Sequence, residues 1–563
     1  MRLLHLLSTL ALGGLALAGS VEDLQQRGVA QGKNGWLFHV AEFGQYKQET
    51  PQDIDEKLRF IATVNRLFES RGIKLVVALV PAKLHLYSDQ LPDDLPLTDP
   101  IRTRYTRAIT QLREMNVRTV DLYTPMAAGR RAPEEAQYPV YQKQDHHWSS
   151  RGAVIAAKAV GDYIKANLDL KDIPAVNFDL VAQKPETYLE SSLTPRLPQN
   201  RQAAYKPEPF VPYELKRLSP GGGLLDQTDP LVTLVGSSAS KGGRLWPFDL
   251  GLNAFLGREV ANAAQAGRGP WLPMEDYLRD IVFQRTPPKV VIWQLWEAFL
   301  LDVDQAALPQ EWALTLAPLI LDGCASPRPL TSDGKALTLP KLSLGDYLVA
   351  DVTPKGTERL GVQLSGAGMS RELSLKLGPE GTAYRIKVPL YLDRPGTPQQ
   401  LAFSSKNGSF RLERARLCSL PAEVVSTLTP APGTLDLVAT NPAKVALQGF
   451  SDSENGSIRW AEGASTSVSV WSAGEKTGRV QFTFYNPIAG QELVVLWNGK
   501  PLETLSGLPA GQDLQRALEL RFEPGRNTLE FRVKHYNGSG SDFAKGDSRP
   551  LSILFRSLQW SQP

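Results

Sequence analysis

The sequence predicts an α/β unit, with a parallel sheet covered by helices on both faces, followed by two all-β sandwiches. Between residue 51 and about residue 300, amphipathic stretches alternate with short, continuous apolar runs. Beyond about residue 305, the segments become short and alternating, and Gly, Pro and Asp separate them. The length of 563 residues also favours several domains over a single core.

The first half of the α/β unit contains three predicted helices and two predicted strands. Apolar residues recur at spacings of three and four over 53–71, which predicts an amphipathic helix that ends at Gly72. The run GIKLVVALVP predicts a strand covered on both faces. A second helix near 101–112 precedes the short strand VRTVDLY, and SRGAVIAAKAVGDYI predicts a third helix with Ser149 or Ser150 as its N-cap.

A long Pro-rich connection over 184–228 leads to the second half of this unit. The segment PLVTLVG predicts another buried strand, and helical stretches follow over 247–264 and near 274–283. The run KVVIWQLW predicts the closing strand. Because ligands of parallel sheets gather beyond the carboxyl ends of the strands, we expect the functional site there.

The two β units are expected over residues 306–422 and 430–563. The second contains Asn498-Gly499, a strong signal for a two-residue hairpin turn. Cys324 and Cys418 lie at the two ends of the first β unit. In an oxidising compartment we expect them to form a disulfide rather than to remain two buried thiols.

The N-terminus has the features of a secretory signal peptide over residues 1–18. One Arg precedes an apolar run, and Ala-Leu-Ala stands before Gly19 as a cleavage signal. Gly13 and Gly14 interrupt the run, which makes an uncleaved membrane anchor the poorer interpretation. The formal net charge of +3 gives no indication of nucleic acid or an anionic membrane as partner.

The stretch QDHHWSSRGA is the one place where a histidine adjoins a carboxylate. In an extended segment, residues two apart share a side, so Asp145 and His147 could form a carboxylate–imidazole pair while His146 points away. Such a pair orients a general base for a hydroxyl nucleophile. The structural alternative is a helix cap in which Asp145 only satisfies backbone N–H groups.

The nucleophile is sought in LVTLVGSSASKGG, where a buried strand ends in Gly and Ser. This arrangement places a hydroxyl beside backbone N–H groups, as an oxyanion hole requires. From these residues alone, Ser237, Ser238 and Ser240 remain equal candidates, and a simple Gly/Ser turn remains the alternative. We expect no cofactor, and the lack of H-x-x-x-H or C-x-x-C spacing speaks against a metal site.

Six segments in one order extend this interpretation: GKNGWLFH, LVPAKLHLYSDQLP, DHHWSSRGA, LVGSSAS, AQAGRGPWLPMEDYL and VVIWQLWEAFL. With them, residues 30–302 resemble the bacterial SGNH hydrolase-like polysaccharide O-acetyltransferases, the family of the periplasmic AlgJ and AlgX proteins. The resemblance implies an SGNH hydrolase-like fold in permuted order, with Asp and His ahead of Ser. The sequence departs from the family at Ser149, Gln294 and Ala298 and matches it at the Asp, His and Ser positions.

Position by position, the resemblance implies Ser238 as nucleophile, His147 as general base and Asp145 as its orienting carboxylate. It also implies Gly267 near the oxyanion hole, and we add Arg268 and Ser240 as oxyanion or substrate candidates.

The predicted function is O-acetylation of an exported polysaccharide in the periplasm, through an acetyl-serine intermediate. The resemblance implies a membrane-bound partner that supplies acetyl groups, together with polysaccharide export machinery. The alternatives are an O-acetylesterase with the same triad and a polysaccharide-binding protein with an inactive site. The expected domains are a catalytic domain over 19–305 and two sandwiches, jelly-roll-like and similar to carbohydrate-binding modules, with Trp460, Trp471 and Trp497 as candidates for glycan stacking.

Overall fold

The computed structural model describes residue 24 and residues 27–562 with internal gaps, and the signal peptide expected at 1–18 lies outside the described residues. The gaps are 44–50, 189–190, 219–228, 302–308, 332–334, 344, 367–368, 378–380, 391–397, 427–432, 440–444, 452, 455, 473, 524, 539–542, 545–546 and 548. The chain forms two compact units. The first comprises residues 1–46, 72–277 and 286–301, and the second comprises 47–71, 278–285 and 302–563.

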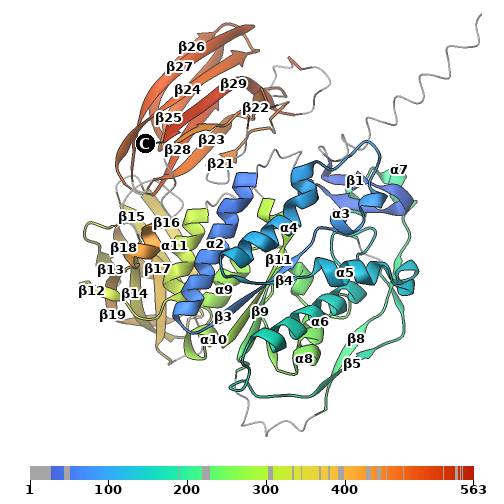
Figure 1. The fold of residues 1–563 in the computed structure, drawn as a ribbon. Helices are drawn as coiled ribbons and strands as arrows, with labels where there is room; N and C mark the ends of the chain where they lie inside the picture. Colours follow the sequence, from blue (N-terminus) through green and yellow to red (C-terminus); the bar gives the residue numbers. More distant parts are fainter. Residues whose placement is uncertain are drawn as a thin grey trace, which may run out of the picture. The chain divides into compact units, whose positions relative to one another are not determined.

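A five-stranded parallel sheet forms the centre of the first unit (Figure 1). Its strand order is β10-β9-β11-β3-β4. The strands are β3 (Lys74–Val80), β4 (Arg118–Asp121), β9 (Val232–Val235), β10 (Val260–Asn262) and β11 (Val290–Trp296). The chain runs from β3 to β4 toward one edge and from β9 to β10 toward the other, and β11 fills the position between β9 and β3. A ligand crevice is expected where the strand order reverses in this way.

Helices cover both faces of this sheet, because its strands are apolar on both sides. The helices are α3 (Lys83–Leu86), α4 (Asp99–Glu114), α5 (Tyr123–Arg130), α6 (Ser150–Asn167), α8 (Phe248–Leu256) and α9 (Leu272–Arg279). Residues of α6 and α8 share one buried core with Val76 and Ile292 on one face of the sheet. On the other face, the Tyr277 hydroxyl of α9 donates to Thr233 Oγ1 of β9 at 3.0 Å.

Two parts of the first unit differ from the sequence prediction. The Pro-rich connection contains two small antiparallel ladders, which pair β5 (Phe178–Ala182) with β8 (Tyr213–Arg217), and β6 (Glu186–Tyr188) with β7 (Glu208–Phe210). The helix expected over 247–264 ends at Leu256, because Gly257 adopts the left-handed conformation with φ of 66° and the chain then enters β10.

The second unit begins with a helix that the sequence prediction assigned to the α/β domain. This helix, α2 (Pro51–Ser70), packs in the second unit with α11 (Pro309–Ile320), and Arg71 Nη1 donates to the carbonyl of Ile320 at 3.0 Å. The sequence prediction did not anticipate α11. The short helix α10 (Ile281–Arg285) also belongs to this unit.

The first β segment of this unit folds into two four-stranded antiparallel sheets. Their strand orders are β12-β19-β14-β17 and β13-β18-β15-β16. The strands are β12 (Ala325–Pro329), β13 (Ala336–Thr338), β14 (Asp346–Lys355), β15 (Arg359–Gly366), β16 (Met369–Lys376), β17 (Tyr384–Pro389), β18 (Pro398–Ser404) and β19 (Ser409–Ser419). Cys324, just before β12, forms a disulfide with Cys418 on the neighbouring strand β19, which confirms the predicted pair.

The last segment contains two five-stranded sheets that share one hydrophobic core. One has the order β20-β29-β24-β27, with β22 also paired to β29, and the other has the order β21-β23-β28-β25-β26. The strands are β20 (Gly433–Asp436), β21 (Val445–Gln448), β22 (Arg459–Glu462), β23 (Ser465–Ser472), β24 (Lys476–Asn486), β25 (Gln491–Trp497), β26 (Lys500–Leu508), β27 (Gln512–Phe522), β28 (Gly525–Val533) and β29 (Leu551–Gln562). Asn498 and Gly499, both at positive φ, form the expected turn between β25 and β26.

Two of the three tryptophans proposed for glycan stacking are buried, which corrects that prediction. Trp471 is 1% exposed, and Trp497 is 7% exposed in the shared core, where its Nε1 donates to the carbonyl of Arg521 at 2.8 Å. A sugar ring cannot reach a side chain that already packs inside the domain. Trp460 on β22 is partly exposed and lies beside Phe543, with ring centroids 5.9 Å apart.

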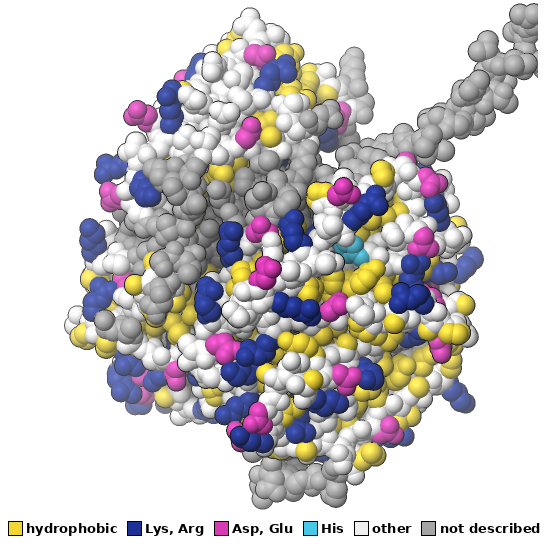
Figure 2. All heavy atoms as spheres, in the orientation of Figure 1, with side chains coloured by type: hydrophobic (Ala, Val, Ile, Leu, Met, Phe, Trp, Pro, Cys, Tyr) yellow, Lys and Arg dark blue, Asp and Glu magenta, His cyan; other side chains and the backbone are white. Residues whose placement is uncertain are grey.

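The surface carries charges of both signs. On the face shown in Figure 2, Lys and Arg side chains lie among Asp and Glu side chains rather than in one basic patch. This mixture agrees with the small net charge of the sequence. Among the described residues, no helix combines the length and the apolar character needed to span a membrane.

Candidate active site

A pocket opens at the carboxyl ends of three neighbouring strands of the parallel sheet. Val80 ends β3, Trp296 ends β11, and Ser237 and Ser238 follow β9. The remaining lining residues come from the segment before α6, from the loop after β9 (residues 236–240, called the Ser loop) and from the interior of β11. They are Tyr141, His146, His147, Trp148, Ala239 and Gln294. The pocket therefore lies where the strand order reverses, as parallel-sheet proteins arrange their ligand sites.

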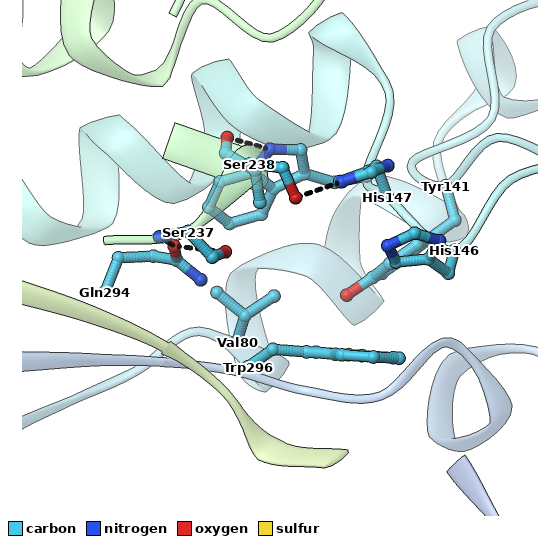
Figure 3. Close-up of a pocket in the computed structure, with 10 residues that line it drawn as sticks. Val80, Tyr141, His146, His147, Ser237, Ser238, Gln294 and Trp296 are labelled. Atoms are coloured by element: carbon cyan, nitrogen blue, oxygen red, sulfur yellow. Dashed lines mark hydrogen bonds between the residues drawn. The ribbon is translucent and has the colours of Figure 1, made fainter. Parts of the chain in front are cut away.

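The loop after β9 is shaped by its contact with Gln294 on the neighbouring strand. A Cβ atom at Gly236 would lie 2.8 Å from Oε1 and 3.0 Å from Cβ of Gln294, so the position has room only for glycine. Oε1 of Gln294 accepts hydrogen bonds from the backbone N–H of Ser237 and from the hydroxyls of Ser237 and Ser240, each at 3.0 Å. These contacts engage the hydroxyls of Ser237 and Ser240, whereas Ser238 lines the pocket from the start of the short helix Ser238–Ser240 with its hydroxyl directed at His147 (Figure 3).

The Asp–His segment is a tight turn rather than the extended stretch that we expected. Tyr141 and Trp148 form an isolated antiparallel bridge, and the residues between them fold back on themselves. Within the turn, the backbone N–H of His147 donates to Oδ1 of Asp145 at 3.0 Å, a local pattern that Asp side chains favour. Ser149 is the N-cap of α6 and accepts from the N–H of Gly152, so Asp145 is not the helix cap.

The turn and the Ser loop bring three side chains into one hydrogen-bonded row. Oδ1 of Asp145 lies 2.6 Å from Nδ1 of His147, and Nε2 of His147 lies 2.7 Å from Oγ of Ser238 (Figure 3 shows the second contact). The indole Nε1 of Trp148 donates to the carbonyl of Ala239 at 3.0 Å and so ties the two loops together. With Nδ1 protonated and facing the carboxylate, Nε2 is free to accept the serine proton.

The surroundings of Asp145 keep its carboxylate ionised. Burial by itself raises the pKa of Asp145, but the hydrogen bond from His147 and the nearby imidazoles of His147 and His146 outweigh it. The backbone N–H of Ser192 adds a further bond to Oδ2 at 2.8 Å, and the net result is a pKa below the usual range. A charged carboxylate in this position stabilises the imidazolium that forms when His147 takes a proton.

His146 does not point away from the site, which corrects the expectation from alternation. Its ring centroid lies 3.9 Å from that of His147 and 5.4 Å from that of Trp296, and it lines the same pocket. Nδ1 of His146 lies 2.8 Å from the Ser192 hydroxyl. Burial and the neighbouring His147 lower the pKa of His146 well below its usual value, so the ring is neutral near pH 7.

Lys83 holds the backbone of the Asp–His turn, which comprises residues 141–148. Its ammonium donates to the carbonyls of Gln142, Lys143 and Asp145 at 3.1, 3.2 and 2.7 Å. Burial lowers the pKa of Lys83 to about 8, although Glu42, Glu208 and Asp145 oppose this shift. The ammonium thus uses all of its N–H groups to hold the backbone of the turn.

A second buried ion cluster fixes the chain at the carboxyl end of β3. Oε1 of Glu297 lies 2.5 Å from Nε of Arg104 and 2.8 Å from Nε2 of His85, and Oε2 accepts the N–H of Ala82 at 2.8 Å. Burial raises the pKa of Glu297, but Arg104 and His85 outweigh it and lower the pKa to about 2. The cluster therefore holds the segment that begins α3 and contains Lys83.

Gln294, which lines the pocket, carries a buried polar atom without a partner among the described residues. Nε2 of Gln294 has no hydrogen-bond acceptor among the described residues, and the side chain is only 1% exposed. An unsatisfied buried donor costs about 1–3 kcal/mol. Such an atom in a native pocket calls for an explanation.

The other predicted site residues lie outside the lining of this pocket. Gly267 and Arg268 are exposed, and Nη2 of Arg268 pairs with Oδ2 of Asp276 at 3.0 Å. Ser240 is fully buried and serves as a donor to Gln294. The structure therefore brings Asp145, His147 and Ser238 together, whereas Gly267 and Arg268 are not among the residues that line their pocket.

The ligand-type atoms of Asp145, His146 and His147 lie within 4.8 Å of one another and form the one such group among the described residues. Metal ligation at this position would compete with the bonds already present. Oδ1 of Asp145 and Nδ1 of His147 face each other, and Nε2 of His147 faces Ser238. The contacts favour a proton-transfer site over a metal site.

Several site residues escaped the sequence analysis: Lys83, Ser192, Trp246 and Trp296 were not selected, and Gln294 was noted only as a departure. Trp246 lies over His147, with ring centroids 4.3 Å apart. Lys83 stands in the segment LVPAKLHLYSDQLP, which was quoted only for its resemblance, so that segment held a usable signal. The contacts of Gln294 and Trp246 join residues far apart in sequence, and no local motif marks them.

Comparisons with known proteins identify relatives for the first half of the chain. The family profile described as "SGNH hydrolase-like domain, acetyltransferase AlgX" matches residues 29–297. The probable alginate O-acetylase AlgJ of Pseudomonas aeruginosa is 30% identical over 305 residues, covering 51% of this chain and 75% of that protein. The alginate biosynthesis protein AlgX of Azotobacter vinelandii is 30% identical over 277 residues, covering 46% and 53%. The solved O-acetyltransferase domain of Pseudomonas putida AlgJ is 30% identical, with a TM-score of 0.42 and coverage of 49% and 93%.

Proposed function

Since the chain belongs to the SGNH hydrolase-like acetyltransferase family of AlgX and AlgJ, we propose that it O-acetylates hydroxyl groups of an exported polysaccharide. The observation that supports the proposal most strongly is the hydrogen-bonded row of Ser238, His147 and Asp145 at the strand ends. The names of the relatives make alginate the first polysaccharide to test.

The proposed reaction has two halves that use the same three residues. His147 Nε2 takes the proton of Ser238 as the serine oxygen attacks the acetyl carbon of a donor ester, and then returns that proton to the leaving oxygen. The acetyl group is now bound to Ser238. A sugar hydroxyl, deprotonated by His147, attacks the acetyl-serine, and Ser238 recovers its proton as the acetylated sugar leaves.

Backbone N–H groups beside Ser238 are the proposed oxyanion donors. No described residue accepts from the N–H of Ser238 or of Ala239, because the first N–H groups of a helix have no intrahelical partner. Each such donor contributes about 3–4 kcal/mol to the stabilisation of a tetrahedral intermediate. Gly267 is a further proposed contributor to the oxyanion hole.

The proposed location is the periplasm, reached by means of the signal peptide over 1–18. The disulfide between Cys324 and Cys418 supports export, because such bonds persist in oxidising compartments. The proposed partners are a membrane-bound protein that supplies acetyl groups and the machinery that exports the polysaccharide. The proposed domains are a catalytic domain over 19–305 and two jelly-roll-like sandwiches, similar to carbohydrate-binding modules, over 306–422 and 430–563. Trp460 is the remaining stacking candidate.

The test is the Ser238→Ala variant, assayed for acetate release from a chromogenic acetyl ester. We expect turnover to fall by at least ~10³-fold, with an unchanged melting temperature, because the nucleophile is removed and the buried contacts remain. Ester turnover at the wild-type rate in this variant would contradict the mechanism. Mass analysis of oligosaccharides incubated with the enzyme and a donor ester then separates transfer, which gives acetylated sugar, from hydrolysis, which gives acetate alone.

A further inference from the structure

The amide group of Gln294 is fixed in one orientation by its contacts. Its Oε1 faces one backbone N–H and two hydroxyl groups, and the backbone N–H can only donate. The oxygen must therefore face the Ser loop, and Nε2 must face the opposite way. Rotation of the amide would bring Nε2 against the N–H of Ser237, so that two donors would face each other and that hydrogen bond would be lost.

The opposite side of this amide is the wall of the pocket that contains Ser238. Gln294 lines that pocket, and Nε2 is buried without an acceptor among the described residues. In Figure 3, Nε2 points away from Ser237 toward Val80, whose methyl groups cannot accept a hydrogen bond. The pocket thus contains a preoriented donor that has no acceptor within the part of the chain that the structure describes.

We propose that Nε2 of Gln294 donates a hydrogen bond to the acetyl carbonyl oxygen as this atom becomes an oxyanion. The inference rests on the proposed function, since it concerns the same reaction at Ser238. It adds a catalytic residue from the interior of β11 to the donors offered by the backbone beside Ser238. Gln294 would then have two roles, because Oε1 shapes the Ser loop while Nε2 contacts the reacting group.

The chemistry of the step calls for a hydrogen-bond donor beside the carbonyl oxygen. When Oγ of Ser238 bonds to the acetyl carbon, the serine proton moves to His147, and the π electrons of the carbonyl become a negative charge on oxygen. Collapse of the intermediate restores the carbonyl and expels the leaving oxygen, which takes the proton from His147. A hydrogen bond from Nε2 grows stronger as that charge develops and so stabilises the transition state more than the ground state.

Two substitutions separate the two roles of Gln294. Gln294→Glu retains an oxygen that can accept from Ser237 and Ser240, but it replaces the donor with a second acceptor. Gln294→Leu removes both functions. If Gln294 only held the Ser loop, the Glu variant would be far more active than the Leu variant.

We expect kcat for a chromogenic acetyl ester to fall about 100-fold in Gln294→Glu, because one oxyanion donor is lost, while KM stays close to the wild-type value. In Gln294→Leu kcat should fall at least as far, because the contacts that shape the Ser loop are lost as well. The melting temperature should be higher for Gln294→Glu than for Gln294→Leu, since the former retains the contacts to the Ser loop. This measurement also shows whether each variant is folded under the assay conditions.

A kcat of Gln294→Glu within a few fold of wild type would overturn the inference, whatever the Leu variant does. A loss that appears in KM rather than kcat would overturn it as well, because it would indicate ground-state binding. The Ser238→Ala variant serves as the separate test of the proposed function. If Ser238→Ala is inactive while Gln294→Glu is fully active, the reaction stands and only the role of Nε2 fails.

Discussion

At the scale of single residues, the charge on Asp145 decides which nitrogen of His147 carries the proton. Oδ1 receives both the backbone N–H and the ring Nδ1 of His147, and Oδ2 receives the N–H of Ser192. The same carboxylate therefore shapes the turn and orients the ring. A neutral amide in its place would preserve the shape but lose the preference for one tautomer.

We predict that Asp145→Asn lowers kcat by about 10⁴-fold, since the wrong tautomer would then face Ser238. The measurement is kcat for a chromogenic acetyl ester, with circular dichroism as the control for folding. In a Ser238→Ala background, the same substitution should have almost no additional effect, because residues that act as a unit are not additive. Equal losses in both backgrounds would contradict the assignment.

The site residues that the sequence indicated share one property: their chemistry is visible in a short motif. Asp145 and His147 are two residues apart, and Ser238 follows a buried strand and a glycine. Lys83 and Gln294 act through partners more than fifty residues away, and only the folded chain brings these partners together. The orientation of His146 was predicted wrongly, because the segment is a turn and the alternation of an extended chain does not apply.

At the scale of elements, the cluster around Glu297 connects the end of β11 with α3 and α4. Arg104 and Glu297 are both fully buried, and His85 completes the set. Removing one partner of a buried ion pair leaves an uncompensated charge, which is more costly than the pair is worth. The corner of the sheet that presents Lys83 to the Asp–His turn depends on this cluster.

We predict that Glu297→Gln lowers the free energy of unfolding by about 3–5 kcal/mol at pH 7. The pKa of Glu297 is about 2 in the folded chain and 4.5 without the fold. Its contribution is therefore complete above pH 4.5 and is lost as the pH falls from 4.5 toward 2. Denaturant unfolding across this range should show the difference between wild type and variant shrinking toward low pH.

The control for this measurement is Glu134→Gln, because the Glu134 side chain is 63% exposed and its nearest cation, Arg151, is 3.9 Å away. An exposed pair of this kind contributes about 0–1 kcal/mol. A constant difference between wild type and Glu297→Gln from pH 6 to pH 2 would contradict the role assigned to the buried carboxylate.

The predicted elements were correct where local sequence decides the outcome. The strands β3, β9 and β11 are continuous apolar runs, and α6 has a true N-cap in Ser149. The ladders within 178–217 were missed because their strands are short and alternate poorly between buried and exposed positions. Gly257 ended α8 earlier than the apolar pattern suggested, since that pattern continues into β10.

At the scale of the whole molecule, the second unit gains stability from one covalent link. Cys324 and Cys418 are 94 residues apart and connect the edge strand β12 with β19. We predict that the double variant Cys324→Ser/Cys418→Ser destabilises this unit by about 2–5 kcal/mol, because the unfolded chain regains the freedom of a long loop. Thermal unfolding measures the loss, and reduction of the wild type should reproduce it. Acetyl-ester turnover at 25 °C should stay at the wild-type level, and an unchanged unfolding transition would refute the prediction.

The pattern of apolar runs and turn residues predicted the order of fold classes along the chain. It did not predict that α2 belongs to the second unit. Its apolar face predicted a helix correctly, although periodicity does not show which partner covers that face. The partner, α11, follows after the whole parallel sheet in sequence. Only the contact between Arg71 and Ile320, together with the packing of the two helices, reveals the arrangement.

This pairing bears on how the protein can be made and divided. During synthesis α2 emerges before the parallel sheet, and its apolar side stays uncovered until α11, which is synthesised after that sheet, has formed. The uncovered apolar side of α2 can associate with other chains during that interval, and a chaperone that binds it would prevent this aggregation. For the same reason, a fragment cut at residue 305 retains α2 but lacks α11, so a soluble preparation should extend through Ile320 or replace the uncovered side chains of α2 with polar ones.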